Sequence, residues 1–405
     1  MTDAPYTPQV PRAPREVYLD YAAATPVAPE VIEAMLPYFT ELFENPSAPY
    51  ARARAVRASY EQARTTLAHL IGAKPGNVTI TAGATEANNL ALATVTGPLI
   101  TAATEHESVL ATVQARGGQL LPVSSEGLVS ASTLEAALTP ETELVSVALA
   151  NGEVGAVQPI RELAAVVAKE RDRRLAAGEK TPLYLHTDAS QAAATRTVDV
   201  SQLRADLVTL SAAKVYGPKQ VGLVWAADGV CLRPLVLGGG QEGGVRSGTE
   251  NVAGAVGFAR ALELASAGRA KESKRLEKLR NGLLRALTGE FSWLQVSGPR
   301  NPKNRLSGLL HISFPGLDAR RLVVLLERRG VSVGTGSACA ASKMRVSHVL
   351  EAMGVSEAAA RGSLRISLGR PTTEDDVRCA GEAIAAVVRE ECARLGLDAR
   401  TGEPA

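Results

Sequence analysis

Short apolar runs rich in β-branched residues alternate along this chain with stretches of helical periodicity, and this alternation constrains the fold more than any other feature. The runs lie at 77–81, 98–101, 143–149, 182–187 and 206–211. Continuous apolar runs of this length are typical of strands that are buried on both faces of a parallel sheet. Because the strands alternate with helices, the pattern predicts an α/β fold with a large, mostly parallel sheet.

The pattern changes after about Gly248, and the remaining sequence predicts a second, smaller unit. Two helical stretches come first, at 251–265 and 271–287. We expect a large domain over 18–262, and a smaller C-terminal α/β domain over 263–405 that also takes up residues 1–17 as an N-terminal arm. Strands and helices of this smaller domain are predicted at 309–315, 319–329, 363–368 and 373–394.

Composition excludes several classes of partner. The 405 residues are 45% hydrophobic, which allows a large core, and the formal net charge is only +2. Acidic and basic residues are interspersed, so we expect no nucleic acid partner. We also expect no membrane partner, because no run is apolar enough to span a bilayer and the N-terminus has no apolar signal segment. These features favour a cytoplasmic location.

The four cysteines argue against a disulfide framework and against a metal site. Cys231, Cys339, Cys379 and Cys392 are widely spaced, and none lies at metal-ligand spacing from a histidine. Cys339 differs from the others because it lies in the run GTGSACAAS, where small residues offer it no apolar packing. Its thiol is therefore either incidental or reactive.

Three motifs that follow predicted strands could bind or attack a small molecule. In TAGATEANN, the free N–H groups of a helix start at Ala84 and the hydroxyl of Thr85 could hold phosphate, although Thr85 could equally be an ordinary cap. In HTDASQ, Asp188 could hold a protonated ring nitrogen or cap the next helix. In VTLSAAKVYGPK, Lys214 follows a buried strand, where desolvation favours a nucleophilic amine, although most lysines are simply solvated.

Taken together, a phosphate cradle, a carboxylate and a strand-end lysine are the parts that pyridoxal phosphate requires. His106, in TEHES, could stack on the cofactor ring and move protons, or it could be a polar residue at a helix start. Arg365 alternates with apolar residues in SLRISLGR, so it either points into a cleft and binds an amino-acid carboxylate or faces water at a strand edge. We expect His186 to be packed and hydrogen-bonded, and Lys219 to lie at the surface.

These motifs resemble those of the cysteine desulfurases of the class V aminotransferase superfamily, in particular the NifS/IscS-like branch. The likeness runs from YLDYAAATPV at 18–27 to SLRISLGRPTTEDDV at 363–377 and includes GEVGAVQPI, GGGQEGGVRSGTEN and GTGSACAAS. It implies a fold-type I pyridoxal 5'-phosphate enzyme, a homodimer with a large seven-stranded-sheet domain and a smaller C-terminal domain. It also implies conversion of L-cysteine to L-alanine, with the sulfur passed to an acceptor protein such as an iron–sulfur scaffold or to a thiolation pathway.

The resemblance assigns roles to individual residues. Lys214 would form the Schiff base, Cys339 would accept the sulfur as a persulfide, and His106 would act as an acid or base. Asn45 and Arg365 would hold the substrate. The cofactor would be bound by Ala84, Thr85, Asp188, Gln191 and Ser211, and by Thr249, which would reach the phosphate of the neighbouring subunit.

Three positions depart from the family pattern. Gly152 stands where a second asparagine is usual, Ala213 where a histidine is usual, and Tyr50 near the position of another histidine. The altered pocket keeps two alternatives open: a selenocysteine lyase or other class V lyase or transaminase, and a scaffold without catalysis. Intact Cys339 argues against the first alternative, and intact Lys214 argues against the second.

Overall fold

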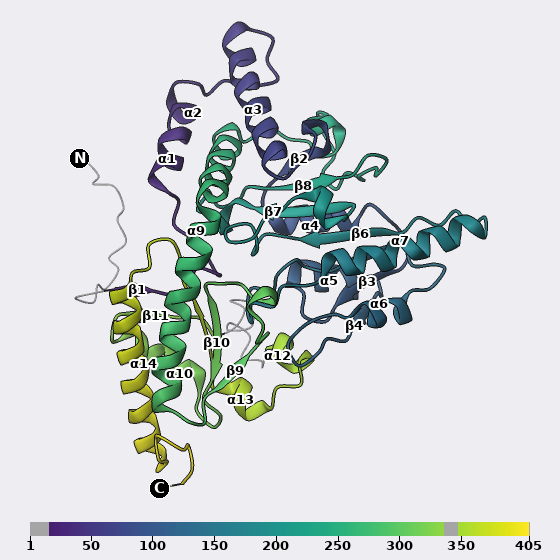
Figure 1. Cartoon of the computed structure of the whole chain (residues 1–405). Coiled ribbons are helices and arrows are strands. Elements are labelled where there is room, and N and C mark those ends of the chain that lie inside the picture. The colour runs from purple at the N-terminus through teal and green to yellow at the C-terminus, as the bar shows by residue number, and fades with distance from the viewer. Residues whose placement is uncertain (1–15, 336–346, 405) are drawn as a thin grey trace.

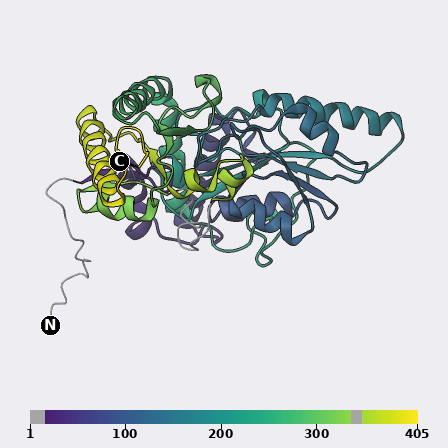
Figure 2. The same cartoon turned by 90° about the horizontal axis from the view of Figure 1, so that it is seen from below.

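A computed structural model describes residues 16–335 and 347–404 of the chain (Figure 1). A seven-stranded sheet forms the large part of the molecule, and the C-terminal part, coloured green to yellow, lies beside one end of that sheet (Figures 1 and 2). The predicted α/β class, with a large sheet and a smaller C-terminal α/β unit, is confirmed. Within the two described ranges, none of the helices combines the length and the apolar character that a membrane span requires.

The large sheet has the strand order β2-β8-β7-β6-β5-β3-β4. Its strands are β2 (Val78–Thr81), β3 (Leu99–Ala102), β4 (Gln119–Leu121), β5 (Leu144–Ser146), β6 (Tyr184–Asp188), β7 (Leu207–Ser211) and β8 (Gly222–Ala226). Strand β8 was not among the predicted strands, and it runs antiparallel to both β2 and β7. The other neighbouring strands are parallel, so six of the seven end at one edge of the sheet.

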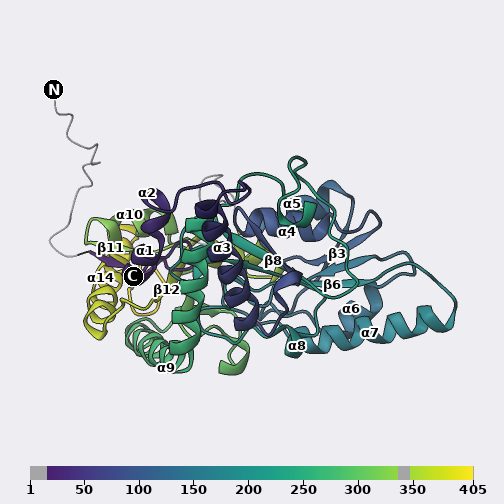
Figure 3. The same cartoon turned by 90° about the horizontal axis from the view of Figure 1, so that it is seen from above.

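Helices cover both faces of this sheet. Successive side chains of a strand point to opposite faces: Leu207 packs in a core with α4 and α5, whereas Val208 packs in a core with α3, α7 and α9. Figure 3 shows α4 and α5 on one side of the strands and α6 to α8 on the other. These helices are α1 (Pro29–Met35), α2 (Pro37–Thr40), α3 (Ala51–Leu70), α4 (Ala84–Leu92), α5 (Glu107–Ala115), α6 (Ala131–Ala137), α7 (Ile160–Ala176), α8 (Val200–Leu203) and α9 (Val252–Glu290).

Helix α9 corrects the prediction of two separate helices, because it is continuous over 39 residues. The predicted break contains Gly268 but no proline, and one glycine inside a helix costs only about 1 kcal/mol. The apolar stripe also continues across the glycine. Ala265 belongs to the core of the large sheet and Leu276 to the core of the C-terminal part, so each half of the helix is held by packing.

The C-terminal part contains a three-stranded antiparallel sheet of order β12-β10-β9 and a parallel pair of β1 with β11. Its core also contains Val17 and Leu19, so the N-terminal strand is tied to the far end of the chain. Its elements are β1 (Val17–Tyr18), β9 (Gln295–Ser297), β10 (Leu309–Ser313), α10 (Ala319–Glu327), β11 (Val331–Ser332), α12 (His348–Ala352), α13 (Glu357–Arg361), β12 (Ser363–Ser367) and α14 (Glu374–Leu395).

Of the four apolar clusters among the described residues, the two largest support the domain division that we propose, 18–262 against 1–17 with 263–405, whereas a small one around Val154, Val349 and Met353 joins the two parts. The first core runs from Ala22 to Ala265 and adds Leu306 and Leu309, and the second runs from Leu276 to Cys392 and adds the N-terminal strand. Four short 3₁₀ turns complete the described structure, at Pro75–Asn77, Ala212–Lys214, Glu242–Gly244 and Pro302–Asn304.

Candidate active site

A cavity of about 800 Å³ opens at the carboxyl edge of the large sheet. Residues that follow β2, β3, β5, β6 and β7 line it, because these strands all end at this edge. Side chains of β12 and α12 complete the lining from the C-terminal part. The structure thereby brings together eight of the residues singled out from the sequence: Ala84, Thr85, His106, Asp188, Gln191, Ser211, Lys214 and Arg365.

The other predicted site residues lie elsewhere. Asn45 and Thr249 are exposed and do not line the cavity. Tyr50 is the N-cap of α3 and is 53% exposed. Cys339 lies outside the described residues.

Lys214 reaches the cavity because a single 3₁₀ turn follows the buried strand β7. Its Nζ donates hydrogen bonds to the carbonyl oxygens of Ala22, at 2.8 Å, and Ala23, at 2.7 Å. Burial lowers the pKa of this amine, the charge of Arg365 lowers it further, and Asp188 opposes the change. A lower pKa increases the neutral fraction of the amine, which is its nucleophilic form.

Asp188, at the end of β6, is one end of a hydrogen-bonded chain that leads to His106. Its Oδ1 accepts from the backbone N–H of Ser190 at 2.9 Å, and its Oδ2 accepts from Asn88 Nδ2 at 2.8 Å. Asn88 also donates to Ser108 Oγ at 2.9 Å, and that hydroxyl lies 2.9 Å from His106 Nδ1. These hydrogen bonds connect the carboxylate of Asp188, through Asn88 of α4 and Ser108, to His106, the residue predicted to stack on the cofactor ring.

Sequence reasoning did not single out Asn88 or Ser108. Asn88 is fully buried on α4, one turn after Ala84, which is the spacing that places two side chains on one helix face. A buried amide needs hydrogen-bond partners, so an asparagine on the apolar face of a predicted helix could have indicated a buried polar contact at this position.

His106 is both the N-cap of α5 and a residue of the cavity wall. Its Nδ1 accepts the backbone N–H of Ser108 at 3.1 Å, so the neutral ring carries its proton on Nε2. The prediction for His186 is confirmed, because the residue is fully buried and its ring nitrogens bond Ser146 Oγ and Thr209 Oγ1. Burial lowers the pKa of His186 to about 4, which keeps it neutral.

The turn where β2 meets α4 is a candidate anion site. Gly83 caps the helix at a φ of +101°, a conformation that suits glycine. The close approach of β8 also requires a glycine, since a Cβ on Gly222 would lie 2.6 Å from the carbonyl carbon of Gly83. The first N–H groups of α4, at Ala84 and Thr85, have no partner within the helix, and an anion can accept them.

Arg365 is 5% exposed on β12, in agreement with the prediction that it points inward. Its Nη2 donates to Asp20 Oδ1 at 2.8 Å, and its Nη1 donates to the carbonyl of Gly152 at 3.3 Å. Asp20, which the sequence analysis did not single out, forms an ion pair with this buried guanidinium. A Cβ on Gly334 would lie 3.0 Å from Nη2, so a glycine there leaves space for this ion pair.

Glu105 is a buried carboxyl group in the cavity wall that the sequence did not single out. It is 3% exposed, and its Oε1 accepts the N–H of Ala148 at 2.7 Å, whereas its Oε2 has no hydrogen-bond partner among the described residues. Burial first, and then the charge of Asp188, raise the pKa of Glu105 to about 8. Glu105 is therefore mostly protonated at neutral pH.

The departure at Gly152 has a structural counterpart. A Cβ at this position would lie 2.7 Å from Gln191 Nε2 and 2.8 Å from the amide carbon of that side chain. Gln191 uses the space and donates to the carbonyl of Ala22 at 3.0 Å. Among the described residues, no group of three or more His, Cys, Asp or Glu side chains could hold a metal ion.

The chain is similar in sequence and in structure to known proteins. Residues 17–379 match the family model described as aminotransferase class V. The chain is 41% identical over 375 residues to the cysteine desulfurase IscS of Dictyoglomus turgidum, which covers 90% of this chain and 92% of that protein. A solved NifS-like protein superposes with a TM-score of 0.84 at 33% identity, over 93% of this chain and 100% of that one. The structure of SspA in complex with cysteine superposes with a TM-score of 0.73 at 35% identity, over 87% of this chain and 98% of that one.

Proposed function

The chain belongs to the class V aminotransferase family and to its cysteine desulfurases, and from this premise we propose that it converts L-cysteine to L-alanine and retains the sulfur as a persulfide on Cys339. One observation carries the proposal: Lys214, Asp188 and Arg365 line a single cavity. A nucleophilic amine, a carboxylate for a ring nitrogen and a guanidinium for a carboxylate can hold a cofactor and an amino acid together.

Pyridoxal phosphate is the cofactor of this family, and the cavity residues fit it. Asn88 and the N–H of Ser190 hold the carboxylate of Asp188, which suits a protonated pyridine nitrogen. When bound, the cofactor withdraws electrons from the substrate and makes bonds at its carbon atoms labile. The residues that would hold the cofactor are Lys214, Asp188, Gln191 at the ring hydroxyl, His106 on the ring face, and Ala84, Thr85 and Ser211 at the phosphate.

Arg365 would orient the carboxylate of cysteine. Its Nε has no partner among the described residues and its Nη1 bond to Gly152 is long, at 3.3 Å, so donors remain for the substrate. The amine of Lys214, with its lowered pKa, would take the proton from the α-carbon. His106 would donate or accept a proton at Nε2, because its Nδ1 already accepts from Ser108.

The sulfur step assigns the remaining role to Cys339. Its thiolate would attack the sulfur of the substrate, so that an S–S bond forms while the carbon–sulfur bond breaks. The carbon then takes up a proton and becomes the methyl group of alanine. A thiol among glycine, serine and alanine residues would meet an acceptor protein more easily than one in a core.

The surface supports a homodimer. Leu36 lies between α1 and α2, Phe39 lies on α2, and Phe43 lies in the segment that follows; their exposed fractions are 56%, 60% and 68%. Large apolar side chains gathered on one surface mark an interaction site. Thr249 is exposed as well, which is compatible with the proposed contact to the phosphate of the neighbouring subunit.

We further propose that an acceptor protein, such as an iron–sulfur scaffold or a thiolation enzyme, receives the sulfur in the cytoplasm. Cys231, Cys379 and Cys392 are free thiols, which supports a reducing compartment.

Release of alanine and sulfide from L-cysteine tests the proposal, in the presence of a thiol reductant and added pyridoxal phosphate. The protein should turn over cysteine, and both Lys214→Ala and Cys339→Ala should abolish sulfide release. Cys231→Ala removes an exposed thiol and is the matched control, expected to keep full activity. A protein that binds the cofactor through Lys214 but leaves cysteine untouched would overturn the proposal and favour another lyase, a transaminase or a scaffold.

A further inference from the structure

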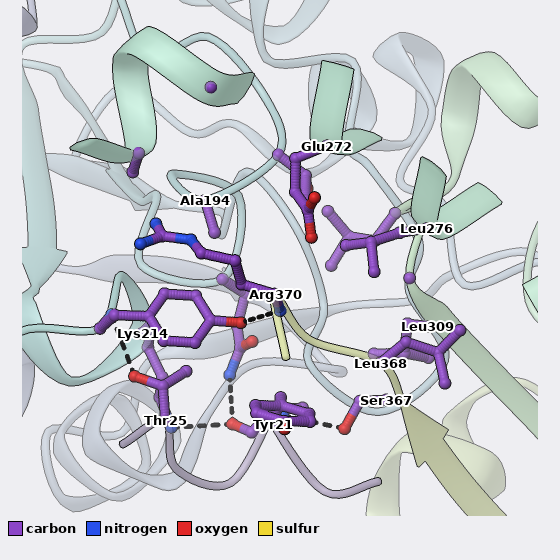
Figure 4. A pocket seen from close by; sticks show the side chains of 18 of the residues that line it. Tyr21, Thr25, Ala194, Lys214, Glu272, Leu276, Leu309, Ser367, Leu368 and Arg370 are labelled. Carbon is purple, nitrogen blue, oxygen red and sulfur yellow. Dashed lines mark hydrogen bonds between the residues drawn. The ribbon is translucent and has the colours of Figure 1, made fainter. Parts of the chain in front are cut away.

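A second cavity, of about 450 Å³, lies between the two parts of the molecule on the far side of Lys214 (Figure 4). We call it the seam cavity. Its lining includes Tyr21 and Thr25 from the N-terminal segment, Tyr216 after β7, Leu276 of α9 and Leu368 after β12. Its volume falls within the range of pockets that hold small organic ligands, about 300–1,000 Å³.

The seam cavity is distinct from the candidate active site. Asp188, His106 and Arg365 do not line it, and among the residues that the structure describes the two cavities share only Ala22, Gln191 and Lys214. Lys214 Nζ and Gln191 Nε2 both donate to the carbonyl of Ala22. These hydrogen bonds lie at the boundary between the two spaces.

The body of the seam cavity is apolar. Figure 4 shows the side chains of Leu276, Leu309 and Leu368 along one side, with Ala194 across from them. Such a surface holds a hydrocarbon group and not a fully polar metabolite. Tyr216 adds an aromatic wall, and it is only 7% exposed.

The charged residues of the lining are mostly basic: Lys214, Lys271, Arg275 and Arg370 against one acid, Glu272. Glu272 is already paired with Arg275 at 2.7 Å, and Arg275 also donates to the carbonyls of Gly369 and Thr372. Arg275 and Glu272 therefore neutralise each other and are held in place.

Arg370 and Lys271 remain as exposed cations at the seam cavity, and neither forms an ion pair with a described acidic side chain. The guanidinium of Arg370 lies 4.4 Å from the centre of the Tyr216 ring, and its backbone N–H donates to the Tyr216 hydroxyl at 2.5 Å. This stacking holds a cation beside an apolar cavity. We propose that the seam cavity binds an organic anion with an apolar body, of the class of medium-chain or aryl carboxylates, whose charge pairs with Arg370 and Lys271.

Calorimetric titration of the cofactor-loaded protein with octanoate tests this proposal. Octanoate should bind saturably, with one site per chain, whereas octylammonium, which has the same chain length and the opposite charge, should not bind. Arg370→Gln and Lys271→Gln should each weaken octanoate binding about tenfold, since each removes one charge-assisted contact. Both residues are exposed, so these variants should fold.

Ala194→Phe should abolish octanoate binding, because the added ring fills the seam cavity. Two controls lie in the separate groove between α9 and α14: Ala286→Phe and Arg389→Gln should leave binding unchanged. Equal binding of octanoate and octylammonium would overturn the proposal, as would affinity that persists in Arg370→Gln and Lys271→Gln or is lost in Ala286→Phe. Cysteine turnover does not enter this test, so its result stands apart from the proposed function.

Discussion

Replacement of Glu105 by glutamine is expected to change how stability depends on pH. Glutamine keeps the shape of the side chain and can accept the N–H of Ala148 as the carboxyl group does. It cannot ionise, however. The variant therefore isolates the contribution of one buried carboxyl group whose pKa is raised to about 8, first by burial and then by Asp188.

The size of the effect follows from linkage. Below an ordinary pKa of 4.5, Glu105 is protonated in both the folded and the unfolded chain, and its contribution to stability is fully present. Between 4.5 and about 8 the unfolded chain ionises while the folded chain keeps the proton, so rising pH destabilises the fold by roughly 1.4 kcal/mol per pH unit. Between pH 5.5 and 7.5, the native protein should lose about 3 kcal/mol relative to Glu105→Gln.

Denaturant unfolding at the two pH values measures this difference. The protein should be freed of cofactor, so that the charge of Asp188 is not balanced by a bound ring. Fluorescence of Trp225 and Trp293 reports on the two parts of the molecule. Glu107→Gln removes a carboxylate from an exposed position two residues away and should follow the native protein. If the native protein and Glu105→Gln showed parallel pH profiles, the raised pKa and the reasoning from burial would be refuted.

Other substitutions test the packing of the site and its support. Gly152→Asn, which introduces the usual family residue, should displace Gln191 and weaken cofactor binding about fivefold. The visible absorption of the bound cofactor measures this change, and tighter binding would contradict the steric argument. Asn88→Leu should lower the free energy of unfolding by about 1–3 kcal/mol, because it leaves a buried carboxylate without its amide donor; an unchanged melting temperature would show that water replaces the amide. Glu242→Gln should cost about 3–5 kcal/mol, since the buried guanidinium of Arg64 would lose its charged partner; an equal loss in Glu61→Gln, its more exposed partner, would contradict this ranking.

The alternating pattern predicted most of the architecture because the strands of a covered parallel sheet are apolar along their whole length. Strand β6 and strand β7 were found this way, whereas the strand of Arg365, in the antiparallel sheet, was found from the alternation of polar and apolar residues. Strand β8 was missed, although all five of its residues are buried. The continuity of α9 could not be predicted either, because it depends on two cores that pack against the same helix from distant parts of the chain.

The candidate site was predicted where a motif follows a strand, as at Asp188 and Lys214. Partners that approach from other segments were not predicted. Asp20 and Arg365 are separated by 345 positions and meet only because the N-terminal segment runs beside β12. Glu105 is a comparable case. Its pKa is raised by burial, and the polar residues around it in the sequence do not indicate that its side chain is buried.

The unbroken helix α9 connects the two parts of the molecule, because its first half packs in one core and its second half in the other. At about 1.5 Å per residue, its 39 residues extend about 58 Å. Gly268, which lines the seam cavity, lies near the middle of the helix. A bend of about 5° at that glycine would move the far end of the helix by about 2.5 Å, given a half-length of about 29 Å. A bend of a few degrees at the middle of the helix would therefore displace its tip by about the size of an atom.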